Sequence, residues 1–139
     1  MLSLRLAHID DSASLNSVSA DLGYDGLSDD EASRCLQNIL NSKTDFVYVA
    51  ESGGSIVGWI HVFYANRLAS KGFYEIGGLV VSKNHRRDGI GKALVEYARQ
   101  QHPGVWRVRC NSARSDAHGF YENIGFQKSK TQYVFENTG

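Results

Sequence analysis

The segment Arg86-Arg87-Asp88-Gly89-Ile90-Gly91-Lys92 combines cations and glycines in a spacing that suits a bound anion. It follows an apolar run at 76–81 and leads into an amphipathic pattern that begins at Ile90. A strand, a glycine-containing loop and a helix start present backbone N–H groups and the positive end of the helix dipole to an anion. Gly89 and Gly91 remove side chains that would keep a ligand away from the backbone. The segment therefore predicts a phosphate-binding loop.

Two common nucleotide loops do not match this spacing. The nucleoside-triphosphate loop needs a glycine five residues before its Gly-Lys pair and a Ser or Thr after it, where this chain has Arg86 and Ala93. The dinucleotide loop needs a third glycine three residues after the second, where Leu94 stands. The remaining pattern is Arg-x-x-Gly-x-Gly, from Arg86 to Gly91.

The elements that must position this loop follow from local patterns. Alternating leucines predict a strand at 2–6, Asp10-Asp11-Ser12 would cap a helix to about Leu22, and Ser28-Asp29-Asp30-Glu31 matches a capping box for a second helix. The further expected elements are strands at 46–50 and 56–64 joined by a Gly53-Gly54 turn, a strand at 73–81, a helix from Ile90 that Pro103-Gly104 ends, a strand at 105–110, a helix at 113–123 and a strand at 132–135. This order indicates α+β or mixed α/β layering.

A second motif, Ala117-x-x-Phe120-Tyr121-x-x-x-Gly125-Phe126, lies one predicted strand after the loop. Helical spacing puts its alanine and its two aromatic residues on one face. The two motifs, in this order, resemble the acyl-coenzyme A-binding signatures of the GNAT superfamily of N-acetyltransferases. The resemblance is close over residues 44–135 and rests on the order of elements over 1–43. It implies one domain over 1–139 with the GNAT fold: a mixed, mostly antiparallel sheet of about six or seven strands, splayed at the cofactor cleft, with about four flanking helices.

The resemblance implies acetyl-coenzyme A as co-substrate. Backbone groups of Leu79, Val80 and Val81 would bind the pantetheine arm and the thioester carbonyl. The pyrophosphate would lie on the amides from Arg87 to Lys92, with charge added by Arg86, Arg87 and Lys92. Many relatives have Asn three residues before the alanine, where this chain has Arg114, so Asn111 is the candidate to contact pantetheine instead. The implied cofactor contacts are thus Leu79, Val80, Val81, Arg86, Arg87, Asp88, Gly89, Ile90, Gly91, Lys92, Asn111, Ala117 and Phe120.

Gly77 and Gly78 lie inside the strand predicted at 73–81. Glycine within a strand often marks a bulge or a close backbone approach. A bulge would splay this strand from the next and open a cleft for the cofactor. The alternative is a bend that only fits the twist of the sheet.

Acetyl transfer to an amine needs a stabilised oxyanion, a base for the amine proton and an acid for the leaving sulfur. By resemblance, Tyr121 is the general acid and Glu75 is the candidate base or substrate-positioning carboxylate. Both also have structural interpretations: Tyr121, like Phe120, as a core aromatic residue, and Glu75 as a solvated edge carboxylate. Many relatives carry the acid two residues later, where this chain has Gly77. The lesser candidates for the base are His85, His118 and Glu122.

Charge is distributed unevenly in a chain whose net charge is zero. Residues 1–51 hold nine acidic and three basic side chains, and residues 52–139 hold six and twelve. A neutral total implies no general attraction to nucleic acid or membranes. The basic part suits a polyanionic cofactor. The acidic part, with Asp21, Asp25, Asp29, Asp30 and Glu31, suits a cationic acceptor such as a polyamine, an aminoglycoside or a lysine side chain, although these residues also cap helices.

The remaining composition predicts a cytoplasmic protein without a metal. The start of the chain lacks the apolar core of a signal peptide, and no run approaches the roughly 20 apolar residues that span a bilayer. Cys35 and Cys110 lie in apolar patterns and are interpreted as buried, reduced thiols. The five histidines show no metal-ligand spacing.

The leading hypothesis is an acetyl-coenzyme A-dependent N-acetyltransferase in which a primary amine of a small molecule or peptide attacks directly. The alternative is a non-catalytic acyl-coenzyme A-binding sensor or scaffold, which needs the loop but neither Glu75 nor Tyr121. The resemblance also allows a homodimer.

Overall fold

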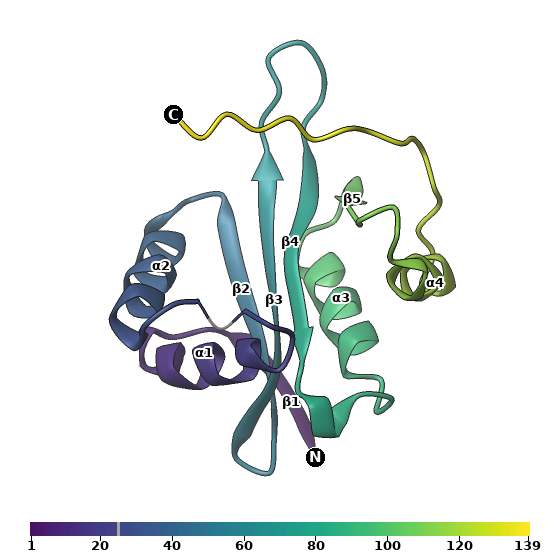
Figure 1. The fold of residues 1–139 in the computed structure, drawn as a ribbon. Helices are drawn as coiled ribbons and strands as arrows, with labels where there is room; N and C mark the ends of the chain where they lie inside the picture. The colour runs from purple at the N-terminus through teal and green to yellow at the C-terminus, as the bar shows by residue number, and fades with distance from the viewer. Residues whose placement is uncertain (25) are drawn as a thin grey trace. The chain divides into compact units, whose positions relative to one another are not determined.

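The computed structural model describes residues 1–24 and 26–139 (Figure 1). The chain forms two compact units, Met1–Val108 and Arg109–Gly139. The elements of the first unit are β1 (Leu2–Leu6), the 3-10 helix η1 (Ile9–Asp11), α1 (Ser12–Ala20), α2 (Asp29–Asn41), β2 (Asp45–Ser52), β3 (Ser55–Ala65), β4 (Phe73–Val81), the 3-10 helix η2 (Lys83–His85), α3 (Ile90–Gln101) and β5 (Trp106–Val108). The second unit contains α4 (Ser115–Asn123).

The first unit is built on one mixed sheet with the strand order β1-β2-β3-β4-β5. Strands β1 to β4 pair antiparallel, and β5 pairs parallel to β4. The expected mixed, mostly antiparallel α/β architecture is confirmed, and the described residues include four α-helices. The strand count is corrected, because the described residues form a sheet of five strands and not six or seven.

The strand expected at 132–135 accounts for part of this difference. The described residues from 127 to 139 form neither helix nor strand, and Tyr133, Val134 and Phe135 are 88%, 81% and 91% exposed. A strand is stabilised by the partner with which it pairs, and the residue pattern of one segment does not report a partner. The strand expected at 105–110 is likewise reduced to Trp106–Val108.

The helices of the first unit cover both faces of its sheet (Figure 1). Leu15 of α1 and Leu36 of α2 are buried in one core cluster with Val47 and Val49 of β2. Helix α3 lies against the other face, close to Gly58 of β3. A Cβ atom at Gly58 would lie 3.2 Å from Ile90 Cγ2 and 3.3 Å from Leu94 Cδ1, both on α3. Glycine at this position therefore lets α3 approach the sheet.

Local sequence signals explain several element boundaries. Gly53 and Gly54 have φ of 60° and 81° and form the turn between β2 and β3, as predicted. The capping box is confirmed, since the Ser28 hydroxyl accepts from the Glu31 N–H and the Glu31 carboxylate accepts from the Ser28 N–H. The helix cap expected from Asp10-Asp11-Ser12 is not formed by a side chain. Asp11 precedes α1, but its carboxylate accepts from the His8 N–H and makes no cap hydrogen bond to α1.

The two cysteines form no disulfide, as expected, but the expectation that both are buried was wrong. Both thiols are free, but Cys35 is exposed and Cys110 is only partly buried. On α2, Leu36 is the buried residue. Because successive helical residues are separated by about 100°, Cys35 lies beside the buried stripe and points to its solvent side.

Candidate active site

Strand β4 contains a β-bulge at the predicted glycine pair. Its register with β3 passes from Ile76 to Gly78 and leaves Gly77 as the extra residue, which confirms the expected bulge. On its other edge, β4 pairs with β5 only from Tyr74 to Ile76. Within the described parts of the chain, no strand pairs with residues 77–81 on that side. This half of β4 therefore has an open edge.

The bulge determines which backbone groups reach the open edge. The N–H of Tyr74 donates toward β5, at 2.9 Å, whereas the N–H of Ser82 donates to β3, at 2.7 Å. In a regular strand these two even-numbered residues would direct their N–H groups to the same side. The extra residue between them reverses this alternation, so their N–H groups point to opposite sides. Counting back from Ser82, Val80 directs its backbone groups to β3, and Leu79 and Val81 direct theirs to the open edge. Two of the three predicted thioester contacts thus have available N–H and C=O groups.

The predicted phosphate loop ends in a helix start that no side chain caps. Gly89 precedes α3 with φ 75° and ψ 15°, and it has no side chain to act as a cap. The first helical hydrogen bond runs from the Ala93 N–H to the Gly89 oxygen, at 3.0 Å. Helix geometry therefore leaves the N–H groups of Ile90, Gly91 and Lys92 without an intrahelical acceptor. These donors and the helix dipole point in the same direction, as an anion site requires.

The cations of the loop are accessible but not all are unbound. Arg86 donates from Nη2 to the backbone oxygen of Asp21, at 3.2 Å, which ties the loop to the end of α1. Lys92 Nζ lies 3.9 Å from Glu96 on the next helical turn. Arg87 has φ 78°, a conformation that costs a residue other than glycine about 1–3 kcal/mol and that clusters at ligand sites. The exposed loop residues are Arg86, Arg87, Asp88, Gly89 and Lys92.

Glu75 lies inside the sheet unit and is not a solvated edge carboxylate. It is 8% exposed and is the one buried charged residue among those described. Its Cα partners are Phe63 on β3 and Arg107 on β5, so these three side chains share the face that α1 and α2 cover. The neighbouring Tyr74 faces the other side, as predicted, where its ring stacks on Trp106 at 5.3 Å.

A histidine–aspartate pair lies on the same face as Glu75. The Nε2 atom of His61 lies 2.8 Å from Oδ1 of Asp45. The Ser42 hydroxyl donates to the other carboxylate oxygen of Asp45, at 2.6 Å, and accepts from the Thr44 N–H, at 3.2 Å. Burial acts to raise the pKa of Asp45, but hydrogen bonds from Ser42 and His61 outweigh it, and the pKa lies below its usual value.

The imidazole of His61 lies directly beside the bulge. A Cβ atom at Gly77 would lie 2.9 Å from His61 Nδ1 and 3.2 Å from Phe63 Cε1. One at Gly78 would lie 2.9 Å from the Trp59 ring. Both glycines therefore give room to rings of β3, which is a physical reason for glycine at two successive positions.

Sequence analysis did not identify this pair, because no local pattern signals it. Regular pairing outward from the Gly53-Gly54 turn would place Asp45 opposite Val62 and His61 on the other face of the hairpin. A register shift between Ala50 and Glu51 instead pairs Asp45 with Phe63 and Val47 with His61, which brings Asp45 and His61 to the same face.

The residues of the second motif lie in the second unit, Arg109–Gly139. Tyr121 is partly buried, and its ring packs edge-on against Phe120, at 5.0 Å, and Phe126, at 5.6 Å. Ala117 is partly buried as well. Asn111 is exposed, and its side-chain oxygen accepts from the Ala113 N–H at 2.9 Å. Within this unit the aromatic packing that was the structural alternative for Phe120 and Tyr121 is present.

The lesser candidates for the base are accounted for as follows. The Nδ1 atom of His85 is buried, with no hydrogen-bond partner among the described residues. His118 Nε2 lies 2.9 Å from the backbone oxygen of Asn111, and Glu122 is exposed. Of these three, His85 lies in the first unit, after β4, and His118 and Glu122 lie in the second unit.

The acidic residues near the expected acceptor segment mostly have local partners. Asp21 accepts from the Lys83 N–H at 3.0 Å, Asp29 accepts from Asn16 at 3.0 Å, and Glu31 belongs to the capping box. Asp30 is exposed, and Asp25 lies outside the described residues. Their part in binding an acceptor is therefore weaker than their number suggests.

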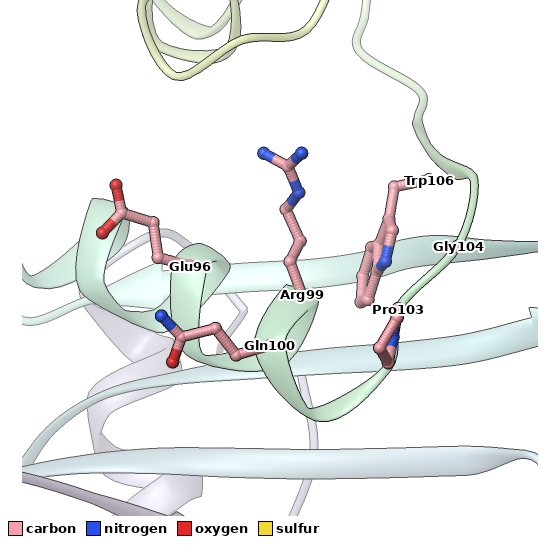
Figure 2. Close-up of a pocket in the computed structure, with 6 residues that line it drawn as sticks. All are labelled: Glu96, Arg99, Gln100, Pro103, Gly104 and Trp106. Atoms are coloured by element: carbon pink, nitrogen blue, oxygen red, sulfur yellow. The ribbon is translucent and has the colours of Figure 1, made fainter.

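A shallow pocket of about 400 Å³ lies at the other end of α3 (Figure 2). In this view the side chains of Arg99 of α3 and Trp106 of β5 both extend upward, and Pro103 lies below Trp106. Helix α3 is about 18 Å long at 1.5 Å per residue, so this pocket is separate from the phosphate loop. None of the residues predicted for the site lines it.

Neither a metal cluster nor a membrane span is found in the part of the chain that the structure describes. No three His, Cys, Asp or Glu side chains among these residues gather where they could hold a metal ion. None of the described helices has the length and apolar character needed to cross a membrane.

Comparison with known proteins agrees with this geometry. The family described as acetyltransferase (GNAT) domain matches residues 43–128, which include β4, the loop and α4. A Mycobacterium tuberculosis protein named as a probable N-acetyltransferase is 33% identical over 81 residues, which are 58% of this chain and 45% of the relative. The chain thus spans about half the length of that relative.

Solved structures share the fold over almost the whole chain. One is an Agrobacterium tumefaciens protein that is named as an acetyltransferase on a provisional basis. It superposes with a TM-score of 0.87 and 22% sequence identity, over 97% of this chain and 99% of its own. An aminoglycoside N-acetyltransferase, AAC(6')-Iy, solved with coenzyme A, superposes with a TM-score of 0.85 and 14% identity, over 100% of this chain and 96% of its own.

Proposed function

The chain belongs to the GNAT family of acetyltransferases, and on this premise we propose that it transfers the acetyl group of acetyl-coenzyme A to a primary amine of a small molecule or peptide. The observation that carries the proposal is the run from the open edge of β4 to the uncapped start of α3. Leu79 and Val81 offer backbone donors and acceptors along that edge, and the N–H groups from Ile90 onward follow after η2 and the loop at 86–89.

This arrangement suits the chemistry of the co-substrate. The pantetheine arm carries amides, which can pair with the edge of a strand as an added strand does. The pyrophosphate carries charge that helix N–H groups and exposed cations stabilise. With the phosphates at Gly89 and Gly91, the thioester would lie along Leu79 and Val81, next to the bulge. One backbone group of that edge would then stabilise the oxyanion that forms at the carbonyl.

Two side chains complete the proposed reaction. Tyr121 would protonate the leaving sulfur of coenzyme A, which makes it the general acid. Glu75 would meet the acceptor amine, as its base or as the carboxylate that holds it in place. Glu75 is 8% exposed and lies on the same face of the sheet as His61 and Asp45, which supports a role at a common site.

The acceptor would be a cationic amine that enters on the face covered by α1 and α2. Glu75 and Asp45 supply negative charge on that face. Aminoglycosides, polyamines and lysine side chains all fit this charge. The aminoglycoside class has further support in the name of the AAC(6')-Iy structure, with which this chain shares the fold.

A turnover assay with acetyl-coenzyme A and a panel of amines would test the proposal. Thiol release that depends on both the protein and one amine is expected. Binding should be followed in parallel by calorimetry with coenzyme A and with ATP, and coenzyme A should bind more tightly. Binding of coenzyme A without turnover on any amine would favour a sensor or scaffold. Preference for ATP would refute the assignment of the loop.

A further inference from the structure

The pair formed by His61 and Asp45 has the geometry of an oriented base. Asp45 is held from its other side by the Ser42 hydroxyl, at 2.6 Å, and His61 meets its free oxygen at 2.8 Å. The side chains of His61 and Asp45 are 23% and 25% exposed, so solvent or a substrate can reach them. A surface ion pair without such support would leave the ring free to turn.

The hydrogen bond to Asp45 fixes where the proton of the neutral imidazole resides. A carboxylate only accepts hydrogen bonds, so Nε2 of His61 must carry the proton that it shares with Asp45. The lone pair of the neutral ring is then on Nδ1. None of the described residues forms a hydrogen bond with this Nδ1 atom. The ring therefore presents an unused proton acceptor in a fixed direction.

That direction leads to the bulge. Nδ1 lies 2.9 Å from the point where a Cβ atom of Gly77 would be, and Gly77 itself is exposed. Two residues further along β4, Leu79 begins the open edge proposed for the thioester. The acceptor atom of His61 thus lies next to the proposed reaction centre, with no side chain at Gly77 to separate them.

Resting on the proposed function, we propose that His61 is the general base of the transfer and that Asp45 is its positioning residue. Nδ1 of His61 accepts one proton from the ammonium form of the acceptor, which frees the nitrogen lone pair. This nitrogen then bonds to the acetyl carbonyl carbon and releases its second proton to solvent. The carbon–sulfur bond breaks, and the sulfur keeps the electron pair and takes a proton from Tyr121. The imidazolium then releases its proton to solvent, and the tyrosinate regains one. Glu75 attracts and holds the cationic acceptor.

The charged groups around His61 are few. On its own face, Asp45 lies on β2, Glu75 on β4 and Arg107 on β5. Arg5 of β1 and Glu51 of β2 lie further along the same face and pair with each other. Helix α1, which covers this face, contains no Asp, Glu, Lys or Arg, and those of α2 are exposed. A change in the pH dependence of turnover after substitution of His61 would therefore report on the pair of His61 and Asp45 or on Glu75.

The test compares the unmutated protein with His61→Gln, Asp45→Asn and Glu75→Gln, using an amine that the unmutated protein acetylates. Glutamine can place its amide near the position of Nε2 and keep the bond to Asp45, but it has no basic nitrogen. We expect His61→Gln to lower kcat/KM at pH 7 by about 100-fold or more. The loss should shrink at high pH, where the amine is already neutral, and coenzyme A affinity should stay unchanged.

The two carboxylate variants separate positioning from proton transfer. Asp45→Asn should lower kcat by about tenfold, since the ring loses its fixed tautomer, and should leave KM for the amine nearly unchanged. Glu75→Gln should raise KM for the amine. Nitrogen-15 spectra of histidine-labelled protein should show the tautomer with a proton on Nε2 of His61, and Asp45→Asn should shift this signal.

Each failure has its own meaning. If the unmutated protein releases thiol with an amine but His61→Gln keeps its rate and pH profile, the assignment of His61 is refuted and the proposed function stands. A proton on Nδ1 in the spectra refutes the assignment as well. If no amine supports thiol release by the unmutated protein, the proposed function fails and the assignment fails with it.

Discussion

Substitution of Gly89 by alanine separates two reasons for glycine at this position. One is the left-handed backbone conformation, and the other is the space that the bound phosphates would need. Gly89 has φ +75°, and a Cβ atom there would meet nothing within 4 Å. Steric clash in the free protein is therefore absent, and only the backbone conformation opposes a side chain. The left-handed conformation costs alanine roughly 1–2 kcal/mol. Restriction of the unfolded chain by alanine offsets about 0.4–1 kcal/mol of this, so the free energy of unfolding should fall by about 1 kcal/mol.

The hairpin glycine Gly53 offers a matched control. Its φ is +60°, and a Cβ atom there would also meet nothing within 4 Å. Gly53→Ala should therefore cost about as much stability as Gly89→Ala, measured by urea unfolding. Only at Gly89 would the new methyl group occupy space proposed for the phosphates. Calorimetry should show that Gly89→Ala weakens coenzyme A binding about tenfold or more, which is 1.4 kcal/mol or more, and that Gly53→Ala does not.

Two results would refute this reasoning. Equal affinity of Gly89→Ala and the unmutated protein for coenzyme A would show that the ligand does not approach this backbone. Equal weakening by Gly53→Ala would show that affinity follows stability and carries no information about the loop.

Three further predictions concern the bulge, the acid and the core. Gly77→Ala places a methyl group 2.9 Å from His61 Nδ1, so turnover should fall while calorimetry shows unchanged coenzyme A binding; an unchanged rate would contradict the position given to the base. Tyr121→Phe should slow thiol release in a spectrophotometric assay and leave the Kd for coenzyme A unchanged; a wild-type rate would remove Tyr121 from the reaction. Burial lowers the pKa of His102 from its ordinary value of 6.5, and its Nε2 atom lies 2.6 Å from the Tyr48 hydroxyl. The unfolded chain then binds the proton more readily, so stability is full above about pH 6.5 and falls as the pH drops below it; unfolding curves for His102→Gln should lose that part of the pH dependence, and an unchanged dependence would assign it to other groups.

The sequence predicted those parts of the fold that depend on neighbouring residues. The bounds of β4 were predicted at both ends, because an apolar run stops at a polar segment on each side. The Gly53-Gly54 turn and the box from Ser28 to Glu31 were predicted because each is a contact between residues at most a few positions apart. The strand expected at 132–135 failed because pairing depends on a distant partner, about which local alternation carries no information.

The candidate site likewise contains local features that the sequence predicted and contacts between distant residues that it did not. The uncapped start of α3 and the bulge at Gly77 are local features, and glycine signals both of them. The pair of His61 and Asp45 joins residues 16 positions apart through the register of a hairpin. Its two members look ordinary when each is considered alone. The burial of Glu75 also could not be predicted from neighbouring residues. Glu75 is buried because β5 pairs beside β4 at this position, which makes β4 an interior strand there.

The bulge also has a consequence for how this site can change during evolution. In a regular strand, residues at odd separations face opposite sides of the sheet. With Gly77 as the extra residue, the positions of Glu75, Gly77 and Gly78 all face the side where His61 lies. A carboxylate can therefore be gained at one of these positions and lost at another without leaving that side. Acidic residues at different alignment columns of related chains can then be functional equivalents, and an alignment that scores each column separately would count such an exchange as a loss.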